Sequence, residues 1–382
     1  MARITRTLAL TTCGIAISLF TSVIQAADTR VNCHQPGVKG TIAYALKWLN
    51  PADTNVVRVS GHCVENLVIR GFNRLSILAE QGALIEGVSG VDLPVIEISD
   101  SLRVVVQGFI IRGGTTGLHC SRSSSCRFIG DTVEDTKAGA VNYNAAISID
   151  GSDVELTDIV VRNVVDLGIA LYGAKAVANN VSVNGVTNVN SFTGGAGLFM
   201  TAGSLRNGPI KIQNTDAAGL SAFHGSALDI SQLTVTDNGG VGVWIGDGSV
   251  LNVGVLTVER SKVFGLLFQT GSAGNFYGTG SLIDSNRYDG IVVQGGSSVG
   301  IGGVTVSNNP VFGLFVDDVS VVYFYGPSNF MQNSYDIWCN PPTATVQNLG
   351  NATNTTTNCG TTSPLAPANA LTVPKVPGLP HN

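Results

Sequence analysis

Short apolar stretches, each opened by a glycine, recur along the middle of the chain at a nearly constant interval. Their first residues are Gly168, Gly197, Gly219, Gly242, Gly265, Gly290 and Gly313, with spacings of 29, 22, 23, 23, 25 and 23 residues. Each stretch has the length of a short β-strand, and a fixed period of this size is typical of a solenoid or a propeller.

Two further columns follow each strand. A glycine with a small neighbour comes next, as in Gly225-Ser226, and predicts a turn that needs a positive φ; Val319-Ser320 breaks this column. A Val/Ile-rich segment ending in asparagine follows, as in Val306-Ser-Asn-Asn309. Stacked asparagines can hydrogen-bond along a ladder. We place Asn214 in this ladder, and Ser261 replaces the asparagine in one repeat.

The repeat length favours a parallel β-helix. A propeller blade needs four strands in roughly 40 residues, whereas about 23 residues here hold two or three strands, which suits one coil. Residues 55–339 therefore predict an all-β parallel β-helix solenoid of about twelve coils, which form one domain because each coil buries its apolar face against its neighbours.

Both ends of the predicted solenoid differ in pattern from the repeats. Within residues 28–54, Ile42, Ala45, Leu46 and Leu49 have helical spacing and predict an N-terminal capping helix, which Asn50-Pro51 would end. Residues 340–382 are rich in proline, threonine and asparagine and predict a C-terminal cap with a flexible tail.

Residues 1–27 have the pattern of a secretory signal peptide. Arg3 and Arg6 precede an apolar stretch, and small residues suited to cleavage lie before Ala27. We therefore expect an exported protein, periplasmic or extracellular, with no transmembrane segment. A lipoprotein cleavage site at Cys13 is the weaker alternative.

Charge narrows the range of partners. Only 12% of residues are charged, about half the usual share. Because the leader holds two of the 21 basic residues and none of the 26 acidic ones, the mature chain has a net charge of −7. No basic stripe is present, so nucleic acid is excluded as a partner, and polyanionic glycans would be repelled unless calcium bridged them.

Six cysteines remain after the leader, an even number that suggests disulfides in an exported chain. Sequence proximity favours Cys33–Cys63, Cys120–Cys126 and Cys339–Cys359. Metal binding is the weaker interpretation, because no C-x-x-C motif is present and no histidine has zinc-finger spacing.

The glycine-opened strands, the Gly-Ser turns, the V-x-x-N runs and the segment from Asn55 to Ile69 resemble the right-handed parallel β-helix repeat proteins of bacteria, in the pectin-lyase-like superfamily. The resemblance implies a right-handed coil. It also implies polysaccharide as the ligand class, since many members are pectate lyases, polygalacturonases or alginate epimerases, while others are binding or surface proteins.

The catalytic motifs of those enzymes are incomplete here. Asn214-Thr-Asp216 matches the first polygalacturonase signature and Asp317-Asp318 resembles the second, but they lie four coils apart and no Arg-x-Lys follows. The Asp-Pro-His-Asp signature of alginate epimerases and the nonapeptide calcium repeat are both absent. We therefore assign no cofactor and no metal, with calcium left open as a bridge to a glycan.

The outward side of the glycine-opened strands offers a candidate binding face. Strand alternation directs the second and fourth residues after each glycine outward. Aromatic rings with polar side chains between them suit sugars, which present C–H groups and hydroxyls. The predicted groove consists of Tyr172, Phe199, Phe223, Trp244, Gln269, Gln294 and Phe315. Alternatively, the tail, a second subunit or the loops at 137–144 and 186–195 cover this face.

Acidic residues near the same face are candidates for catalysis. His224 is one coil from Asp247, about 5 Å along the axis, and the two could act as an acid–base pair. Asp317 and Asp318 are further candidates. The alternative is that all four side chains are simply solvated surface groups.

These observations favour an exported β-helix protein that recognises polysaccharide through an aromatic and polar face. A second hypothesis is a polysaccharide lyase or glycoside hydrolase with an unrecognised site, so the pattern leaves enzymatic activity undecided. A third is a structural or adhesive surface protein, which would form oligomers through the aromatic face.

Overall fold

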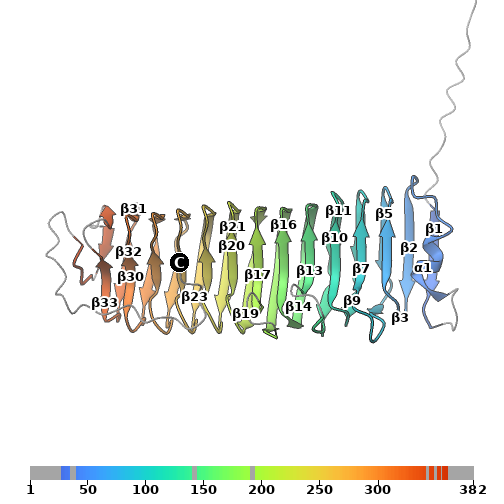
Figure 1. Ribbon diagram of the computed structural model, residues 1–382, viewed down its shortest axis with the longest axis horizontal. Coiled ribbons are helices and arrows are strands. Elements are labelled where there is room, and N and C mark those ends of the chain that lie inside the picture. The colour runs from blue at the N-terminus through green and yellow to red at the C-terminus, as the bar shows by residue number, and fades with distance from the viewer. Residues whose placement is uncertain are drawn as a thin grey trace, which may run out of the picture.

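The chain forms a long rod of stacked coils in the computed structural model, which describes residues 27–34, 40–139, 144–189, 194–340, 344–347, 351–353 and 355–359 (Figure 1). Strands of successive coils pair in parallel along the whole rod. This confirms the predicted parallel β-helix. The predicted leader lies outside the described residues except for Ala27, as does most of the predicted tail.

One sheet takes a single strand from each coil, and its 12 strands match the predicted number of coils. We call it the first sheet. Its strands are β4 (Leu67–Arg70), β7 (Pro94–Ser99), β10 (Thr116–Ser121), β13 (Ala145–Asp150), β15 (Leu167–Tyr172), β17 (Ala196–Thr201), β20 (Leu220–Phe223), β22 (Val243–Ile245), β24 (Leu266–Phe268), β27 (Ile291–Val293), β30 (Phe312–Val316) and β33 (Tyr335–Cys339).

The second sheet closes the coils and holds 23 strands among the described residues. Most coils contribute two strands to it, separated by a corner, whereas β14, β16, β21 and β23 run through that corner without a break. Its strands are β1 (Ala27–Asn32), β2 (Asn55–Ser60), β3 (His62–Val64), β5 (Leu75–Ala79), β6 (Leu84–Glu86), β8 (Val104–Gln107), β9 (Ile110–Arg112), β11 (Ser125–Ile129), β12 (Thr132–Glu134), β14 (Asp153–Val165), β16 (Lys175–Thr187), β18 (Ser204–Asn207), β19 (Ile210–Thr215), β21 (Ala227–Thr236), β23 (Val250–Glu259), β25 (Ala273–Phe276), β26 (Ser281–Asp284), β28 (Ser298–Ile301), β29 (Val304–Ser307), β31 (Val321–Phe324), β32 (Ser328–Met331), β34 (Thr345–Gln347) and β35 (Ala352–Thr353).

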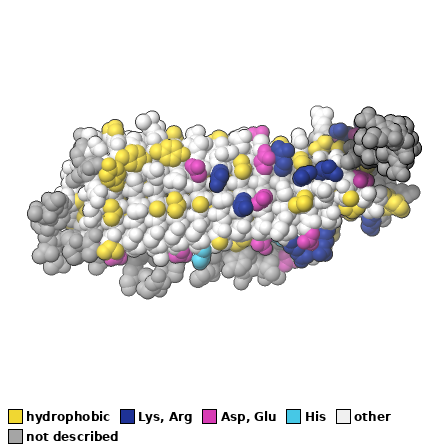
Figure 2. All heavy atoms as spheres, turned by 90° about the horizontal axis from the view of Figure 1, so that it is seen from above, with side chains coloured by type: hydrophobic (Ala, Val, Ile, Leu, Met, Phe, Trp, Pro, Cys, Tyr) yellow, Lys and Arg dark blue, Asp and Glu magenta, His cyan; other side chains and the backbone are white. Residues whose placement is uncertain are grey.

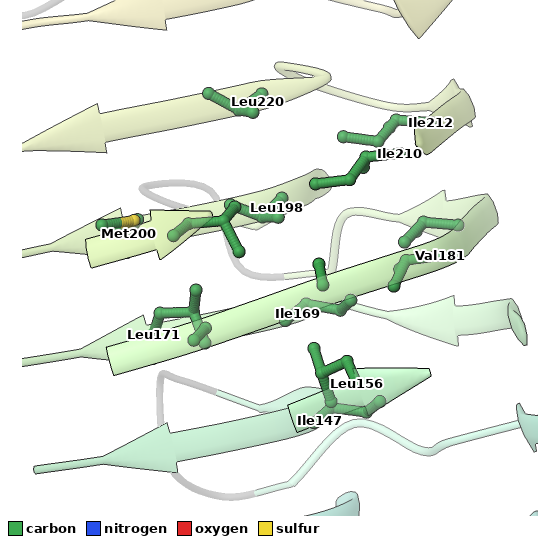
Figure 3. Packing of buried hydrophobic residues seen from close by; sticks show 14 of the residues in the cluster. Ile147, Leu156, Ile169, Leu171, Val181, Leu198, Met200, Ile210, Ile212 and Leu220 are labelled. Atoms are coloured by element: carbon green, nitrogen blue, oxygen red, sulfur yellow. The ribbon is translucent and has the colours of Figure 1, made fainter. Parts of the chain in front are cut away.

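The core is a set of apolar columns inside the rod. Ile147, Ile169, Leu198 and Leu220 occupy the same register position in four successive coils and point into the interior, where all are buried (Figure 3). Each coil therefore buries its apolar side chains against the coils before and after it, as expected for a solenoid.

Glycine opens the first-sheet strands because a side chain has no room there. A Cβ built on Gly242 would lie 2.6 Å from the carbonyl oxygen of Gly265 in the next coil. The glycine column thus allows successive coils to approach closely at this point.

The turns after these strands confirm the prediction of positive φ at most glycines of the second column. Gly225 and Gly248 have φ of +73° and +70°. Val319, which breaks the column, still adopts φ +48°, and at Gly203 the left-handed residue is the preceding Ala202. The neighbouring serines form a buried ladder that sequence reasoning missed.

A buried asparagine ladder is also present, with one correction. The Oδ1 atom of Asn286 accepts the Ser261 N–H at 3.0 Å, and Oδ1 of Asn309 accepts the Asn286 N–H at 3.1 Å. Asn214, however, is not part of the ladder: it is exposed and has a positive φ, one residue before the ladder position. Thr215 occupies the ladder position in this coil, and its hydroxyl donates to Asn238 Oδ1.

The predicted N-terminal helix is shorter than expected. Helix α1 spans Ile42–Leu46, with Thr41 as its N-cap, and the Glu65 carboxylate accepts the Ile42 and Ala43 N–H groups at 2.8 and 2.9 Å. The α-helix does not continue to Leu49, because the Leu49 N–H donates to the Leu46 carbonyl, three residues earlier, as in a 3₁₀ turn. One five-residue helix therefore lies at this end of the rod (Figure 1).

The three predicted disulfides are confirmed. Cys33–Cys63 joins the segment before the helix to β3, and Cys120–Cys126 joins a first-sheet strand to the next strand of the second sheet. Cys339–Cys359 ties the segment after β33 to the last coil.

Candidate functional site

The register of the first sheet agrees with the outward columns predicted from strand alternation. Phe199 pairs with Ala170 on one side and Ser221 on the other, and Ser221 pairs with Trp244. Tyr172, Thr201 and Phe223 follow one another in the neighbouring column. Residues distant in the chain are thereby aligned on one face of the rod.

Four of the predicted groove residues form a continuous row of touching rings. Ring centroids lie 5.9 Å apart for Tyr172 and Phe199, 6.1 Å for Phe199 and Phe223, and 5.0 Å for Phe223 and Trp244. All four side chains are half-buried. We call these four residues the aromatic strip; it crosses the coils of β15, β17, β20 and β22.

A glycine creates room for the strip. A Cβ built on Gly246 would lie 2.9 Å from Cδ1 of Phe223 and 3.6 Å from Cγ of Gln269. Phe223 and Gln269 therefore flank Gly246. The Gln269 Oε1 atom accepts from Nε2 of Gln294 at 3.4 Å, which places both predicted glutamines beside the C-terminal end of the strip.

Phe315 points outward, as alternation predicts, but neighbouring side chains cover it. It is 5% exposed and stacks on Phe312, with centroids 5.3 Å apart. Phe264 and Phe312, which precede the strand glycines of their coils, pack with Leu267, Val292 and Phe315 in a second hydrophobic cluster outside the sheet. Neighbouring residues of the same coils therefore cover the C-terminal part of this face. Most of the tail and the middle of the loops at 137–144 and 186–195, which were the covers considered from the sequence, lie outside the described residues.

The structure brings His224 and Asp247 together at the edge of the strip. His224 Nε2 lies 3.8 Å from Asp247 Oδ2, and His224 Nδ1 lies 3.0 Å from Thr201 Oγ1. Both His224 and Asp247 are exposed, and both have a positive φ in the turn that follows their strands. Both side chains are therefore open to solvent.

Asp317 and Asp318 lie apart from this pair. Asp317 is three coils from Asp247, roughly 14 Å along the axis. Its Oδ1 atom accepts from the Asp318 N–H at 2.9 Å and from Asn340 Nδ2 at 2.8 Å. Asp247 and Asp317 therefore lie farther apart than the two carboxylates of a glycoside hydrolase, which need a separation of about 5–9.5 Å.

The indole nitrogen of Trp244 is a further feature of the site. The Trp244 Nε1–H is buried and has no acceptor among the described residues, a feature that sequence reasoning missed.

The surface of the rod is uneven in composition. On the face in Figure 2, most basic side chains lie in the middle and the N-terminal half of the rod, and hydrophobic side chains gather toward the C-terminal end.

One group of potential metal ligands occurs in the described part of the chain, Cys33, Cys63 and Glu65. The two sulfurs are bonded to each other, and the carboxylate already accepts the helix N–H groups. The group is therefore structural. Within the described ranges, no helix is long and apolar enough to cross a membrane.

Comparisons with known proteins support the fold. A family model described as a right handed beta helix region matches residues 218–363, in agreement with the expected right-handed coil. No curated protein matches the chain.

The solved structures that are similar to this chain include two of a phage tailspike protein. One is the enzymatically active domain of tailspike protein 2 of bacteriophage CBA120, with 10% identity and a TM-score of 0.36, over 81% of this chain and 47% of that chain. The other is full-length tailspike protein 2 from Escherichia coli O157:H7 bacteriophage CAB120, with 13% identity and a TM-score of 0.39, over 82% and 43%. This chain spans less than half the length of either.

Proposed function

We propose that this protein recognises a polysaccharide, which lies along the aromatic strip. The observation that carries the proposal is the uninterrupted contact of Tyr172, Phe199, Phe223 and Trp244 across four successive coils. Half-buried rings fixed by packing offer apolar faces at little entropic cost, and such faces suit the C–H surfaces of sugars.

The length of the strip favours a polymer over a single sugar. Three coil steps separate Tyr172 from Trp244, which amounts to about 14 Å along the rod. Polar side chains that can bind hydroxyl groups line its edge, among them Thr201, His224 and Gln269. A chain of several sugar units can contact the rings and these polar groups together.

The charge favours a neutral polysaccharide. Asp247 is exposed at the edge of the strip, and the mature chain has an excess of acidic residues. A polyanion would therefore bind only with calcium as a bridge. We also propose that residues 1–27 direct export, since three disulfides suit an extracytoplasmic location.

Retention of the protein in gels that contain a polysaccharide tests the proposal. The panel includes neutral polymers (dextran, starch and galactomannan) and acidic ones (alginate and polygalacturonate), each with and without calcium. We expect retention by at least one neutral polymer without calcium. Absence of retention by every polymer contradicts the proposal.

Cleavage of the same ligand is the second candidate function. The contact between His224 and Asp247, at 3.8 Å beside Phe223, favours it. Mass spectrometry of each polymer after incubation separates the two functions. Cleavage by this pair would be established if the wild type produces shortened or unsaturated oligosaccharides and the Asp247→Asn variant does not. Intact polymer after incubation with the wild type would mean that the protein binds the polymer without cleaving it.

Self-association is the third candidate, because a half-buried aromatic strip can also pack against a second copy of the chain. Light scattering distinguishes it from glycan binding. A dimer that dissociates in the Trp244→Ala variant, with no retention by any polymer, would favour a structural or adhesive role.

A further inference from the structure

A column of alternating glycine and tyrosine lies at the corner between the two halves of the second sheet. Gly254, Tyr277, Gly302 and Tyr325 occupy this corner in four successive coils. The backbone bonds support this placement, because Tyr277 N donates to the Val253 carbonyl and Gly302 N donates to the Phe276 carbonyl. Tyr325 N continues the series by bonding the Ile301 carbonyl.

Gly300 and Gly302 let the ring of Tyr325 lie against the rod. A Cβ built on Gly300 would lie 3.1 Å from Cε1 of Tyr325, and one built on Gly302 would clash with the same ring. Tyr277 also reaches toward the N-terminal end of the rod, since its hydroxyl donates to Oδ1 of Asp229, two coils earlier, at 3.5 Å. Both side chains thus run along the rod axis.

These rings remain open to solvent. Tyr277 is 52% exposed, Tyr325 is 39% exposed, and the nearby Tyr323 is 42% exposed. None of the three is covered as Phe315 is. Exposed large aromatic side chains that share a surface indicate a place of contact with another molecule.

Polar side chains form the adjoining column. Asp229, Asn252, Asn275, Gly300 and Tyr323 are in register in five successive coils, and Arg206 precedes Asp229 in the same column. Burial and the Asp229 carboxylate raise the pKa of Tyr277, while burial and Tyr277 raise the pKa of Tyr325. The phenols therefore keep their protons and can donate hydrogen bonds.

We propose that these residues bind a neutral polysaccharide chain lying along the rod, on a second surface separate from the aromatic strip. We call them the tyrosine row: Tyr277, Tyr323, Tyr325, Asp229, Asn252 and Asn275. The ligand class rests on the proposed function. The row belongs to the second sheet, whereas the strip belongs to the first, so each surface offers its own stacking faces and hydroxyl partners.

The dimensions of the row suit an extended polymer. Four coil steps separate Asp229 from Tyr323, which corresponds to about 19 Å along the rod. Rings stack on sugar faces, while the amides of Asn252 and Asn275 can donate to and accept from hydroxyl groups. The mature chain has an excess of acidic residues, so an acidic polymer is disfavoured.

Affinity electrophoresis in dextran, starch and galactomannan tests this second surface with full-length mature protein. The test variant is Tyr277→Ala/Tyr325→Ala, and the matched control is Trp48→Ala, which removes an aromatic ring that is 75% exposed elsewhere. We expect affinity to fall about tenfold in the test variant, equivalent to about 1.4 kcal/mol, and to stay unchanged in the control. Light scattering and circular dichroism on each variant report its assembly and fold.

Each outcome separates the two surfaces. The variant Phe199→Ala/Phe223→Ala, which we call the strip variant, removes two rings of the aromatic strip. If the tyrosine variant and the strip variant both bind more weakly, and the two losses add when the substitutions are combined, the row is supported. Unchanged retention of the tyrosine variant, with loss in the strip variant, overturns the row and leaves the proposed function intact. Loss in the tyrosine variant alone supports the row and contradicts the strip.

Two other results would overturn the row. A wild-type protein that no polymer retains contradicts both surfaces. A wild-type dimer that becomes monomeric in the tyrosine variant, with retention unchanged, would show that the row is an interface between copies of the chain. If the double variant is misfolded, Tyr325→Ser alone is measured against the same criteria.

Discussion

The phenyl ring of Phe223 meets the indole ring of Trp244 edge to face, with centroids 5.0 Å apart and ring planes at 84°. These residues lie 21 positions apart in the sequence and in different outward columns. The coil repeat makes them neighbours, and the small Gly246 leaves room beside the Phe223 ring. Their contact joins the strip to the buried outer cluster, which holds Trp244 in place.

Removal of the Phe223 ring should weaken glycan binding while the rod stays folded. Phe223→Ala deletes the central stacking face of the strip but leaves the core columns untouched. We expect about a tenfold loss of affinity for the retained polymer, or about 1.4 kcal/mol. Titration calorimetry measures it, with Trp48→Ala as a control of equal aromatic character. Equal affinity in Phe223→Ala and wild type would contradict the strip.

Removal of the Phe312 ring should destabilise the rod through the outer cluster. Phe312 is 6% exposed and contacts Phe315, Tyr335 and Trp338. Truncation of a buried phenylalanine costs about 3–5 kcal/mol. We expect Phe312→Ala to lower the urea midpoint strongly, and Trp48→Ala to leave it nearly unchanged. Similar midpoints in the two variants would show that the cluster contributes little to stability.

The Val319 backbone offers a stabilising substitution. Val319 has φ +48° and is exposed, although a β-branched residue is disfavoured in this conformation by roughly 1–2 kcal/mol. Val319→Gly should therefore raise the urea midpoint. The matched opposite is Gly248→Ala, at φ +70° with open space around its Cα, which should lower the midpoint. Shifts with the reverse signs would contradict this explanation of the glycine column.

Asp131 should make stability depend on pH. Its carboxyl group is fully buried and accepts the Phe109 and Ile129 N–H groups. Burial raises its pKa to about 8, with partial compensation by those hydrogen bonds. Unfolding releases the proton, because an unfolded aspartate has a pKa of about 3.9. The contribution to the free energy of unfolding is therefore full below about pH 4 and decreases as the pH rises to about 8.

The Asp131→Asn variant tests this dependence, since asparagine keeps an acceptor but does not titrate. We expect thermal unfolding of the wild type to move to lower temperature between pH 5 and about 8, and the variant to lose part of that slope. Asp289, whose pKa burial raises to about 7, contributes with the same sign and keeps part of the slope in the variant. Identical slopes in the two proteins would mean that Asp131 does not titrate in this range.

The sequence period predicts the fold because one local constraint recurs in every coil. Gly242 and its counterparts mark close approach between coils, and Gly225 and Gly248 mark left-handed turns. A solenoid converts such columns into register. For this reason the predicted neighbours of Phe199 and Trp244 are correct.

Alternation predicts the direction of a side chain, but it does not predict what covers that side chain. Phe315 points outward and is nevertheless buried, because Phe312 in the same coil stacks on it. Tyr277 and Tyr325 lie at a corner outside the glycine-opened strands, so the period of those strands does not indicate them. The three-dimensional structure is needed to place the Tyr325 ring over the backbones of Gly300 and Gly302.

Hydroxyl-radical footprinting with mass spectrometry tests the central claim most directly, because it reports the exposure of individual aromatic side chains. The protein is oxidised with and without the neutral polymer that retains it. Recognition through the strip predicts lower oxidation of Phe199 and Phe223 in the presence of polymer, and unchanged oxidation of Trp48. Unchanged oxidation of Phe199 and Phe223 at a saturating concentration of polymer would contradict it.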